Sequence, residues 1–172
     1  MVSRVIPVDP FDLVIFGGTG DLARRKILPA LFRRFSDGQM PEEARIIGAA
    51  RTEQDGAAWA DWVHKALKEF LPKEECDKTL IKAFLERLDY LPIDATGDGG
   101  WKELKSKMRD GVTQAFYFSV GPSLFGALAE RLHAHEIARE DARIVVEKPF
   151  GRDLASARAL NATLAEHFNE TQ

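Results

Sequence analysis

The stretch VIFGGTGDLARRKILPALF, residues 14–32, passes from strand-forming residues through three glycines into a helical pattern. After a parallel strand, the chain must turn sharply into a helix whose first amides lack partners within the helix. These amides and the helix dipole create an anion site, and glycine allows the close backbone approach that a pyrophosphate needs. Gly18, Gly20 and Ala23 fit the pattern G-x-G-x-x-[G/A]. The stretch therefore predicts a turn that binds a dinucleotide.

Three basic residues, Arg24, Arg25 and Lys26, add positive charge within the first two turns of this predicted helix. Not all three can face one ligand, because successive helical residues point in different directions. The alternative interpretation is an ordinary strand–helix turn with a solvated basic face. The position directly after a predicted strand and at the start of a predicted helix favours the dinucleotide site.

The end of the second predicted strand bears on the choice of coenzyme. In NAD-binding folds of this class, an acidic residue usually sits there and accepts a hydrogen bond from the ribose 2′-hydroxyl. This chain instead reads RIIGAAR, so that Arg51 and then Thr52 follow the strand. A carboxylate would repel a 2′-phosphate, whereas a guanidinium can bind it with two hydrogen bonds. We therefore predict NADP as the cofactor, the alternative being an exposed arginine at a strand end.

The segment RIVVEKPFG, residues 143–151, is a third candidate for chemistry. A predicted buried strand ends in Glu147 and Lys148, and ligands of an open α/β sheet bind at the carboxyl ends of its strands. The ammonium group of Lys148 could hold a hydroxyl or phosphate oxygen there. Spacing alone leaves open the alternative of an ordinary lysine at a strand exit.

The elements that would position these residues alternate along the chain. Short apolar runs predict strands at 12–16, 45–50, 89–94, 115–120 and 143–147, with helical patterns between them and a last helix at 153–168. The order β-α-β-α-α-β-α-β-α-β-α describes one α/β domain over residues 1–172. Its fold would be a Rossmann-like, doubly wound parallel sheet with helices on both faces. Such sheets commonly continue with a further strand, which is compatible with a piece of a longer protein.

Composition narrows the class of protein. The chain has 172 residues and a net charge of −3, so nothing in its overall charge favours nucleic acid as a partner. Cys76 is the single cysteine, which excludes an internal disulfide and favours a reducing compartment. No 18-residue apolar segment and no signal-peptide pattern occur, so we expect a cytoplasmic protein without a membrane partner. The four histidines fall in helical patterns without a surrounding motif, and we expect no metal site.

The glycine turn, IIGAAR and RIVVEKPFGRDLASARALN together closely resemble the coenzyme domain of the glucose-6-phosphate dehydrogenase family, as does YFSVGPSLFGALAERL between them. The resemblance implies that Arg51 binds the 2′-phosphate of NADP and that Lys148 lies between the coenzyme and the sugar phosphate. It also implies a cis peptide bond between Lys148 and Pro149. The coenzyme-binding residues that it implies are Gly17, Gly18, Thr19, Gly20, Asp21, Leu22, Arg51, Asp94, Ala95, Ser119, Val120, Gly121, Pro122 and Lys148.

The family's catalytic segment, R-I-D-H-Y-L-G-K-E, does not occur in this sequence. In the family it supplies sugar-phosphate contacts and the Asp–His machinery, and it follows the helix predicted at 153–168. The resemblance thus implies that no catalytic residue lies within these 172 residues, and that a large α+β domain with the dimer interface belongs to the full-length homo-oligomer. We expect the coenzyme part of an enzyme that oxidises glucose 6-phosphate at C1 with NADP, a step of the oxidative pentose phosphate pathway. The alternatives are a stand-alone NADP-binding or sensing module and the coenzyme domain of another sugar dehydrogenase.

Overall fold

The computed structural model describes residues 8–148 and 150–172 and contains five strands that alternate with helices. The strands are β1 (Phe11–Phe16), β2 (Arg45–Ala50), β3 (Leu88–Pro92), β4 (Thr113–Phe118) and β5 (Arg143–Val146). The helices are α1 (Leu28–Ser36), α2 (Gly56–Phe70), α3 (Lys78–Leu85), α4 (Trp101–Lys107), α5 (Phe125–Ala134) and α6 (Leu154–Ala165). Short helical turns η1 (Ala23–Ile27), η2 (Lys73–Glu75) and η3 (Pro122–Leu124) lie between them. The predicted order of elements is confirmed.

All five strands pair in parallel, in the order β3-β2-β1-β4-β5. The chain therefore winds outward from β1 in one direction through β2 and β3, and in the other through β4 and β5. This reversal confirms the predicted doubly wound, Rossmann-like sheet. It also creates a switch point at the carboxyl ends of β1 and β4, the place where open α/β sheets bind their ligands.

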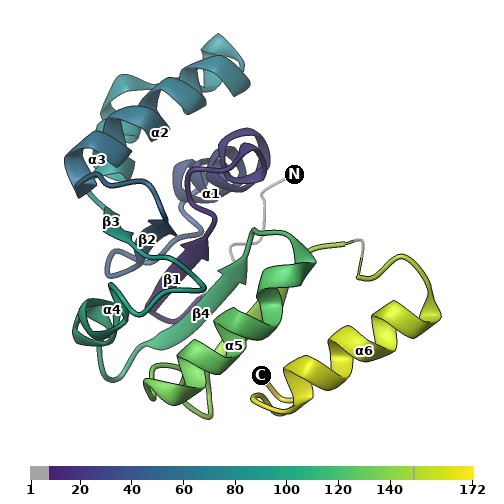
Figure 1. Cartoon of the computed structure of the whole chain (residues 1–172). Coiled ribbons are helices and arrows are strands. Elements are labelled where there is room, and N and C mark those ends of the chain that lie inside the picture. Colours follow the sequence, from purple (N-terminus) through teal and green to yellow (C-terminus); the bar gives the residue numbers. More distant parts are fainter. Residues whose placement is uncertain (1–7, 149) are drawn as a thin grey trace.

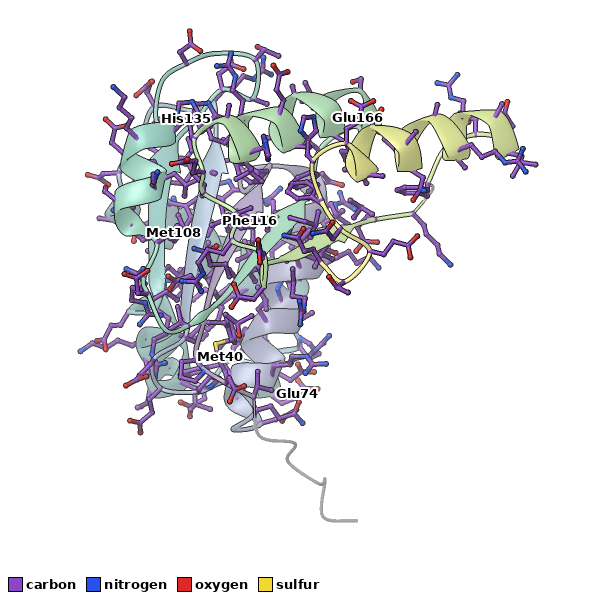
Figure 2. All side chains as sticks on the ribbon, turned by 90° about the horizontal axis from the view of Figure 1, so that it is seen from below. Met40, Glu74, Met108, Phe116, His135 and Glu166 are labelled. Atoms are coloured by element: carbon purple, nitrogen blue, oxygen red, sulfur yellow. The ribbon has the colours of Figure 1, made fainter. Side chains whose placement is uncertain are left out.

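Helices cover both faces of the sheet (Figure 1). The helices α1, α2 and α3 pack on one face, where Ile15 and Ile46 lie in a buried cluster with Trp59 and Phe84. The helices α4 and α5 cover the other face, where Phe116 lies at the centre of a second cluster. Figure 2 shows Phe116 in the interior of the molecule, away from the labelled side chains at its ends. Two packed layers around a sheet thus hold the strand ends in fixed positions.

Strand boundaries differ from the predictions by at most two residues, and those of β2 match at both ends. The strand β4 begins at Thr113 and ends at Phe118, because its register with β1 pairs Thr113 with Phe11 and Phe118 with Phe16. The strand β3 ends at Pro92, as the proline suggests, and lies at an edge of the sheet. An edge position tolerates a residue that cannot donate a backbone hydrogen bond.

A buried carboxylate ties the amino ends of three elements together. Asp12 on β1 is fully buried and accepts two hydrogen bonds from the Arg45 guanidinium, at 2.9 and 3.0 Å. Arg109, in the segment before β4, donates its amide at 2.9 Å and its guanidinium at 2.9 and 2.7 Å to the same carboxylate. Burial alone would raise the pKa of Asp12, but these hydrogen bonds and the charge of Arg45 hold that pKa below its ordinary value.

The helix α6 is the least embedded element and projects beyond the sheet alongside α5 (Figures 1 and 2). Its predicted range of 153–168 shortens to Leu154–Ala165, with none of its residues fully buried. Leu160, Leu164 and Phe168 are partly buried against the core, whereas Leu154 is 66% exposed. The implied cis bond at Pro149 lies outside the described residues. Among the helices of the described ranges, none has the length and apolar character to cross a membrane.

Candidate functional site

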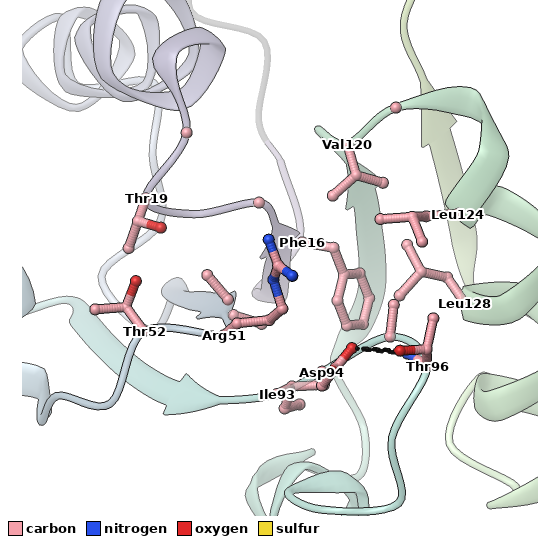
Figure 3. A pocket seen from close by; sticks show the side chains of 16 residues that line it. Phe16, Thr19, Arg51, Thr52, Ile93, Asp94, Thr96, Val120, Leu124 and Leu128 are labelled. Carbon is pink, nitrogen blue, oxygen red and sulfur yellow. Dashed lines mark hydrogen bonds between the residues drawn. The ribbon is translucent and has the colours of Figure 1, made fainter.

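A cleft of about 680 Å³ opens at the switch point of the sheet. Its walls come from the ends of β1 and β2, the segment after β3 and the turn into α5 (Figure 3). Of the residues predicted to bind coenzyme, it brings together Gly17, Thr19, Gly20, Arg51, Asp94, Ala95, Val120 and Gly121. Segments that are far apart in the sequence thus meet at one cavity, at the position that the fold assigns to a ligand.

The glycine turn is fixed by close packing against the neighbouring strands. Gly17 has φ +83°, and a Cβ there would lie 2.1 Å from the carbonyl oxygen of Ser119. A Cβ on Gly18 would lie 2.9 Å from Cα of Gly48 on β2. The amides of Gly17 and Gly18 both donate to the Ala49 carbonyl, at 2.8 and 3.1 Å. Only glycine fits at positions 17 and 18, where the chain passes between β2 and β4. The turn therefore runs directly along the cleft.

Individual glycines play parts that the G-x-G-x-x-[G/A] pattern does not assign. The pattern begins at Gly18, but the positive φ belongs to Gly17, the residue before it. Gly18 supplies the close approach to β2, and Ala23 is fully buried against the sheet, as a small third residue should be. Gly20 is less crowded, since a Cβ there would meet only the Gly17 carbonyl, at 3.1 Å.

Two of the basic residues after the turn, Arg24 and Arg25, contact the end of α2. The guanidinium groups of Arg24 and Arg25 each lie 5.4 Å from the centre of the Phe70 ring. Arg24 also pairs with Glu69, and Arg25 pairs with Asp21 at 2.7 Å. Neither arginine lines the cleft. The charge at the start of the helix therefore joins η1 to the end of α2 by cation–π and ionic contacts.

Asp21 and Leu22, two predicted coenzyme residues, flank the cleft without lining it. The carboxylate of Asp21 is 74% exposed and bound to Arg25, and the Leu22 side chain packs against the core. Their backbone amides belong to the first turn of the helix, where amides lack partners within the helix. Any contribution of these two residues to anion binding therefore comes from their backbone, not from their side chains.

Arg51 lies directly beyond β2 and is exposed at the mouth of the cleft. Figure 3 shows its side chain rising between Thr52 and Phe16. Its guanidinium makes no hydrogen bond or ion pair with any residue in the ranges 8–148 and 150–172. A second cavity of about 470 Å³, lined by Arg51 and Asp94 among others, adjoins the cleft. The guanidinium is thus an uncommitted positive charge at the edge of the site.

Asp94 follows β3 and faces the cleft with a fixed carboxylate. The amide and the hydroxyl of Thr96 both donate to its Oδ1, each at 2.9 Å, as Figure 3 shows in part. These bonds, with a smaller contribution from the charge of Arg51, hold the pKa of Asp94 below its ordinary value. The site therefore carries one negative and one positive side chain at neighbouring positions, Asp94 and Arg51.

The segment after β4 forms the opposite wall. Val120 and Gly121 line the cleft, whereas Pro122 begins η3 and is exposed. The amide of Ser119 donates to the Phe16 carbonyl at 2.9 Å. Its hydroxyl oxygen is buried without a hydrogen-bond partner in the part of the chain that the structure describes. This wall combines an apolar surface at Val120 with the polar exit of β4.

Lys148 is exposed and follows β5, two strands away from β1. It lies at the carboxyl edge of the sheet, as predicted, but outside the lining of the cleft among the described residues. The preceding Glu147 accepts a hydrogen bond from the Tyr117 hydroxyl. Burial of Tyr117, together with this carboxylate, raises the pKa of the tyrosine.

Several residues of the site escape prediction from sequence. The cleft also contains Phe16, Ala49, Ala50, Thr52, Ile93, Thr96, Leu124 and Leu128. Leu124 and Leu128 are four residues apart, on the helical turn that follows β4, and such a spacing after a predicted strand could have indicated them. Nothing in the local sequence marks Phe16 or Ala49, whose place in the cleft depends on the pairing of β1 with β2.

The histidines and Cys76 lie apart from the cleft. The rings of His133 and His167 are 5.6 Å apart, and His135 stacks on Trp101 at 6.0 Å. Cys76 is a free, partly buried thiol beside α2. None of these residues lines the cleft, nor does His64.

Comparison with known proteins identifies the family of the chain. Residues 14–172 match the family model described as "Glucose-6-phosphate dehydrogenase, NAD binding domain". Glucose-6-phosphate 1-dehydrogenase from Rhizobium meliloti (strain 1021) is 46% identical over all of this chain and 35% of that protein. The one from Gluconobacter oxydans (strain 621H) is 43% identical over 96% of this chain and 35% of that protein. The chain thus spans about a third of the length of these curated relatives.

Solved structures agree with the sequence relatives. A crystal structure of glucose-6-phosphate 1-dehydrogenase from Mycobacterium avium superimposes with a TM-score of 0.86 at 36% identity, over 94% of this chain and 35% of that one. A glucose-6-phosphate dehydrogenase in complex with its substrate glucose-6-phosphate gives a TM-score of 0.83 at 32% identity, over 96% of this chain and 36% of that one. The matched family description indicates a nicotinamide dinucleotide as the ligand of such a domain. The chain belongs to the glucose-6-phosphate dehydrogenase family and corresponds to its NAD binding domain.

Proposed function

We propose that the chain binds NADP in the cleft and forms the coenzyme part of an enzyme that oxidises glucose 6-phosphate. One observation carries the proposal, namely that the glycine turn and the uncommitted Arg51 line the same cavity. The turn leads to the amides of Asp21 and Leu22 at the start of the helix, which suit a pyrophosphate, and Arg51 offers a fork of donors that suits a phosphate. The lining, which is mostly apolar with a few convergent polar groups, suits a nucleotide.

The residues fit the two halves of the coenzyme differently. Ile93, Asp94 and Thr96 lie beside Arg51, so this end would receive the adenosine 2′-phosphate. Val120 and Gly121 lie across the cleft, at the exit of β4 toward β5. The nicotinamide would thus lie on the side of the sheet where Lys148 follows β5. In this proposed arrangement, the nicotinamide ring would lie on the same side as Lys148, the one predicted substrate residue.

The proposed reaction of the whole protein is the oxidation of C1 of glucose 6-phosphate to 6-phosphogluconolactone. The C1 hydroxyl loses its proton to a base, and the C1 hydrogen leaves with its electron pair. When bound, the nicotinamide supplies the acceptor for this hydride at C4. The part played by this chain is to hold and orient the coenzyme, while the Lys148 ammonium would bind the sugar phosphate. The relative solved with glucose-6-phosphate supports this choice of substrate.

Replacement of Arg51 tests the coenzyme assignment. A charge-assisted contact with the 2′-phosphate is worth about 1.5–3 kcal/mol, which corresponds to about one to two decades in affinity. We therefore expect Arg51→Ala to weaken NADP binding by that amount and to leave NAD binding nearly unchanged in calorimetric titrations of this chain. Arg34→Ala, which removes an exposed arginine from α1, is the control for net charge. Equal losses of affinity for NADP and NAD in Arg51→Ala would contradict the assignment of Arg51 to the 2′-phosphate.

A further inference from the structure

The segment that carries Arg51 contacts the hydroxyl of a buried tyrosine, Tyr90. The Tyr90 hydroxyl lies 2.8 Å from the carbonyl oxygen of Thr52 and 3.2 Å from that of Ala50, the residues on either side of Arg51. The Ala50 carbonyl also accepts the Ile93 amide at 2.9 Å. A hydroxyl has one proton to donate, so the shorter contact, to Thr52, is the one that holds the segment.

Tyr90 itself has little freedom to move. It lies on β3 opposite Gly48 of β2 and is 4% exposed. Its ring packs against the fully buried Trp59, with the ring centroids 5.8 Å apart. Burial raises the pKa of Tyr90, so its hydroxyl stays protonated and able to donate across the neutral range.

The same aromatic pair also reaches the glycine turn. The indole Nε1–H of Trp59 donates to the carbonyl of Gly18 at 3.0 Å in a buried position. The indole can lie there only because residue 48 has no side chain, since a Cβ on Gly48 would be 2.4 Å from Cζ2 of Trp59. Trp59 and Tyr90 therefore form one rigid support that touches both the phosphate turn and the arginine segment.

Neither ring lines the cleft, so both act through the backbone of other residues. We propose that Tyr90 is a positioning residue that sets the preference for a 2′-phosphate by fixing the carbonyl after Arg51, and that Trp59 is the support that holds Tyr90 in register with the phosphate turn. This inference rests on the proposed role of Arg51. It assigns part of the coenzyme specificity to a side chain that the ligand never touches.

Tyr90→Phe tests the inference, because it removes the hydroxyl and keeps the ring packed on Trp59. The probes are adenosine 2′,5′-bisphosphate and AMP, which differ only in the 2′-phosphate and lack the nicotinamide. A lost hydrogen bond corresponds to about 3- to 10-fold in an equilibrium constant. We expect the affinity of Tyr90→Phe for the bisphosphate to fall by about that factor, with the AMP affinity unchanged within about 2-fold. The ratio of the two affinities is a readout that a general loss of stability would not move.

The matched control is Tyr117→Phe, the same chemical change at the other tyrosine of the chain, whose hydroxyl binds Glu147 instead. It should leave the ratio unchanged. The double variant Arg51→Ala/Tyr90→Phe should bind the bisphosphate no more weakly than Arg51→Ala alone, because Tyr90 acts through Arg51. Circular dichroism and thermal unfolding of each variant establish that the fold is retained.

The outcomes separate this inference from the proposed function. A parent chain with no preference for the bisphosphate over AMP overturns the NADP assignment and this inference together. A parent chain with a preference that survives unchanged in Tyr90→Phe overturns the inference alone. Equal losses for both probes in Tyr90→Phe, or losses in the double variant that add up, also overturn it.

Discussion

At the scale of single residues, the glycine turn depends on one position where neither a side chain nor a negative φ is possible. Gly17 combines φ +83° with a carbonyl 2.1 Å from any added Cβ, whereas Gly38 combines φ +69° with open space. Gly38→Ala should cost about 1 kcal/mol, the penalty of a left-handed residue. Gly17→Ala should cost more and also weaken coenzyme binding, because the turn or β4 must move. Denaturant midpoints of the two variants test this difference, and equal midpoints would contradict it.

A second residue-scale prediction concerns Asp12, whose pKa is lowered in the folded chain by Arg45 and Arg109. Because the folded pKa lies below the unfolded value of about 3.9, the contribution of this group is complete above about pH 4 and is lost as the pH falls through the folded pKa. Asp12→Asn leaves two guanidinium groups without their anion. Because both arginines are partly exposed, the expected effect is moderate. We expect the free energy of unfolding of Asp12→Asn to be lower than that of the parent chain by about 2–4 kcal/mol near neutral pH.

The test of this prediction is the pH dependence of the free energy of unfolding. The parent chain should lose stability more steeply below pH 4 than Asp12→Asn does, since the variant has no carboxyl to protonate there. Asp37→Asn, at an exposed carboxylate beyond α1, is the control. Parallel curves for the parent and Asp12→Asn would show that the buried cluster does not contribute in this pH range.

At the scale of elements, α6 depends on its cap more than on its packing. Asp153 accepts the Ser156 amide at 2.8 Å, and the Ser156 hydroxyl in turn accepts the amide of Asp153 at 3.0 Å. No residue of α6 is fully buried, so these bonds are a large share of what holds its first turn. Asp153→Ala should speed amide hydrogen exchange along α6 and leave β1 unchanged. The corresponding Asp77→Ala at the cap of α3 should affect only α3.

Hydrogen exchange read by mass spectrometry separates these regions. The hydrogen bonds from Ser156 hold the pKa of Asp153 below its ordinary value. The protection of α6 should therefore fall in the parent chain as the pH drops through that lowered pKa, and should not do so in Asp153→Ala. Protection of α6 that is insensitive to the substitution would show that packing on α5 is sufficient.

The elements also show how far the sequence predicts the structure. Strand runs, their order and the ending of β3 at Pro92 follow from local residue types, and so do the glycine turn and the place of Arg51. The parts of Gly17, Trp59 and Tyr90 could not be predicted in this way. Each depends on a partner from a different strand or helix, and the contacts arise from the register of parallel strands, which no local pattern specifies.

Charge patterns are a second limit on prediction from the sequence at this scale. A basic run beside a phosphate turn suggests ligand contacts, but Arg24 and Arg25 enclose the Phe70 ring at the end of α2. The sequence shows the charges at 24–26 and an aromatic residue at 70 without showing that they meet. Electrostatic patterns therefore predict the site only where, as at Arg51, the fold leaves the charge without a partner.

At the scale of the whole molecule, we expect coenzyme binding without turnover. The resemblance places the catalytic base outside these 172 residues, and general-base catalysis contributes typically about 10²–10⁴-fold. Lys148 is a poor substitute, because an ammonium group accepts no proton. The chain, saturated with NADP, should therefore form no reduced coenzyme from glucose 6-phosphate at a measurable rate.

The assay follows the absorbance of reduced coenzyme, with binding of NADP measured calorimetrically on the same sample as the control. Added NADP should also raise the unfolding temperature, since a ligand at 100 times its Kd stabilises a fold by about 2.7 kcal/mol. Turnover in the ordinary range of about 1–10³ per second would show that a base lies within this chain. The proposal that this chain binds the coenzyme while the rest of the protein supplies the base would then be wrong.

The central strand β1 pairs with two strands that lie at very different separations from it along the chain. Asp12 pairs with Arg45 on one side and with Gln114, about three times farther along the chain, on the other. Closing the longer loop costs about 1 kcal/mol more in chain entropy. During folding, β1 can therefore pair with β2, and β2 with β3, while the other edge of β1 has not yet paired with β4. We therefore expect the cleft, which needs β4 beside β1, to be among the last features to form. Asp12, which binds Arg45 and Arg109 at once, joins the half of the sheet expected to form early to the half expected to form late.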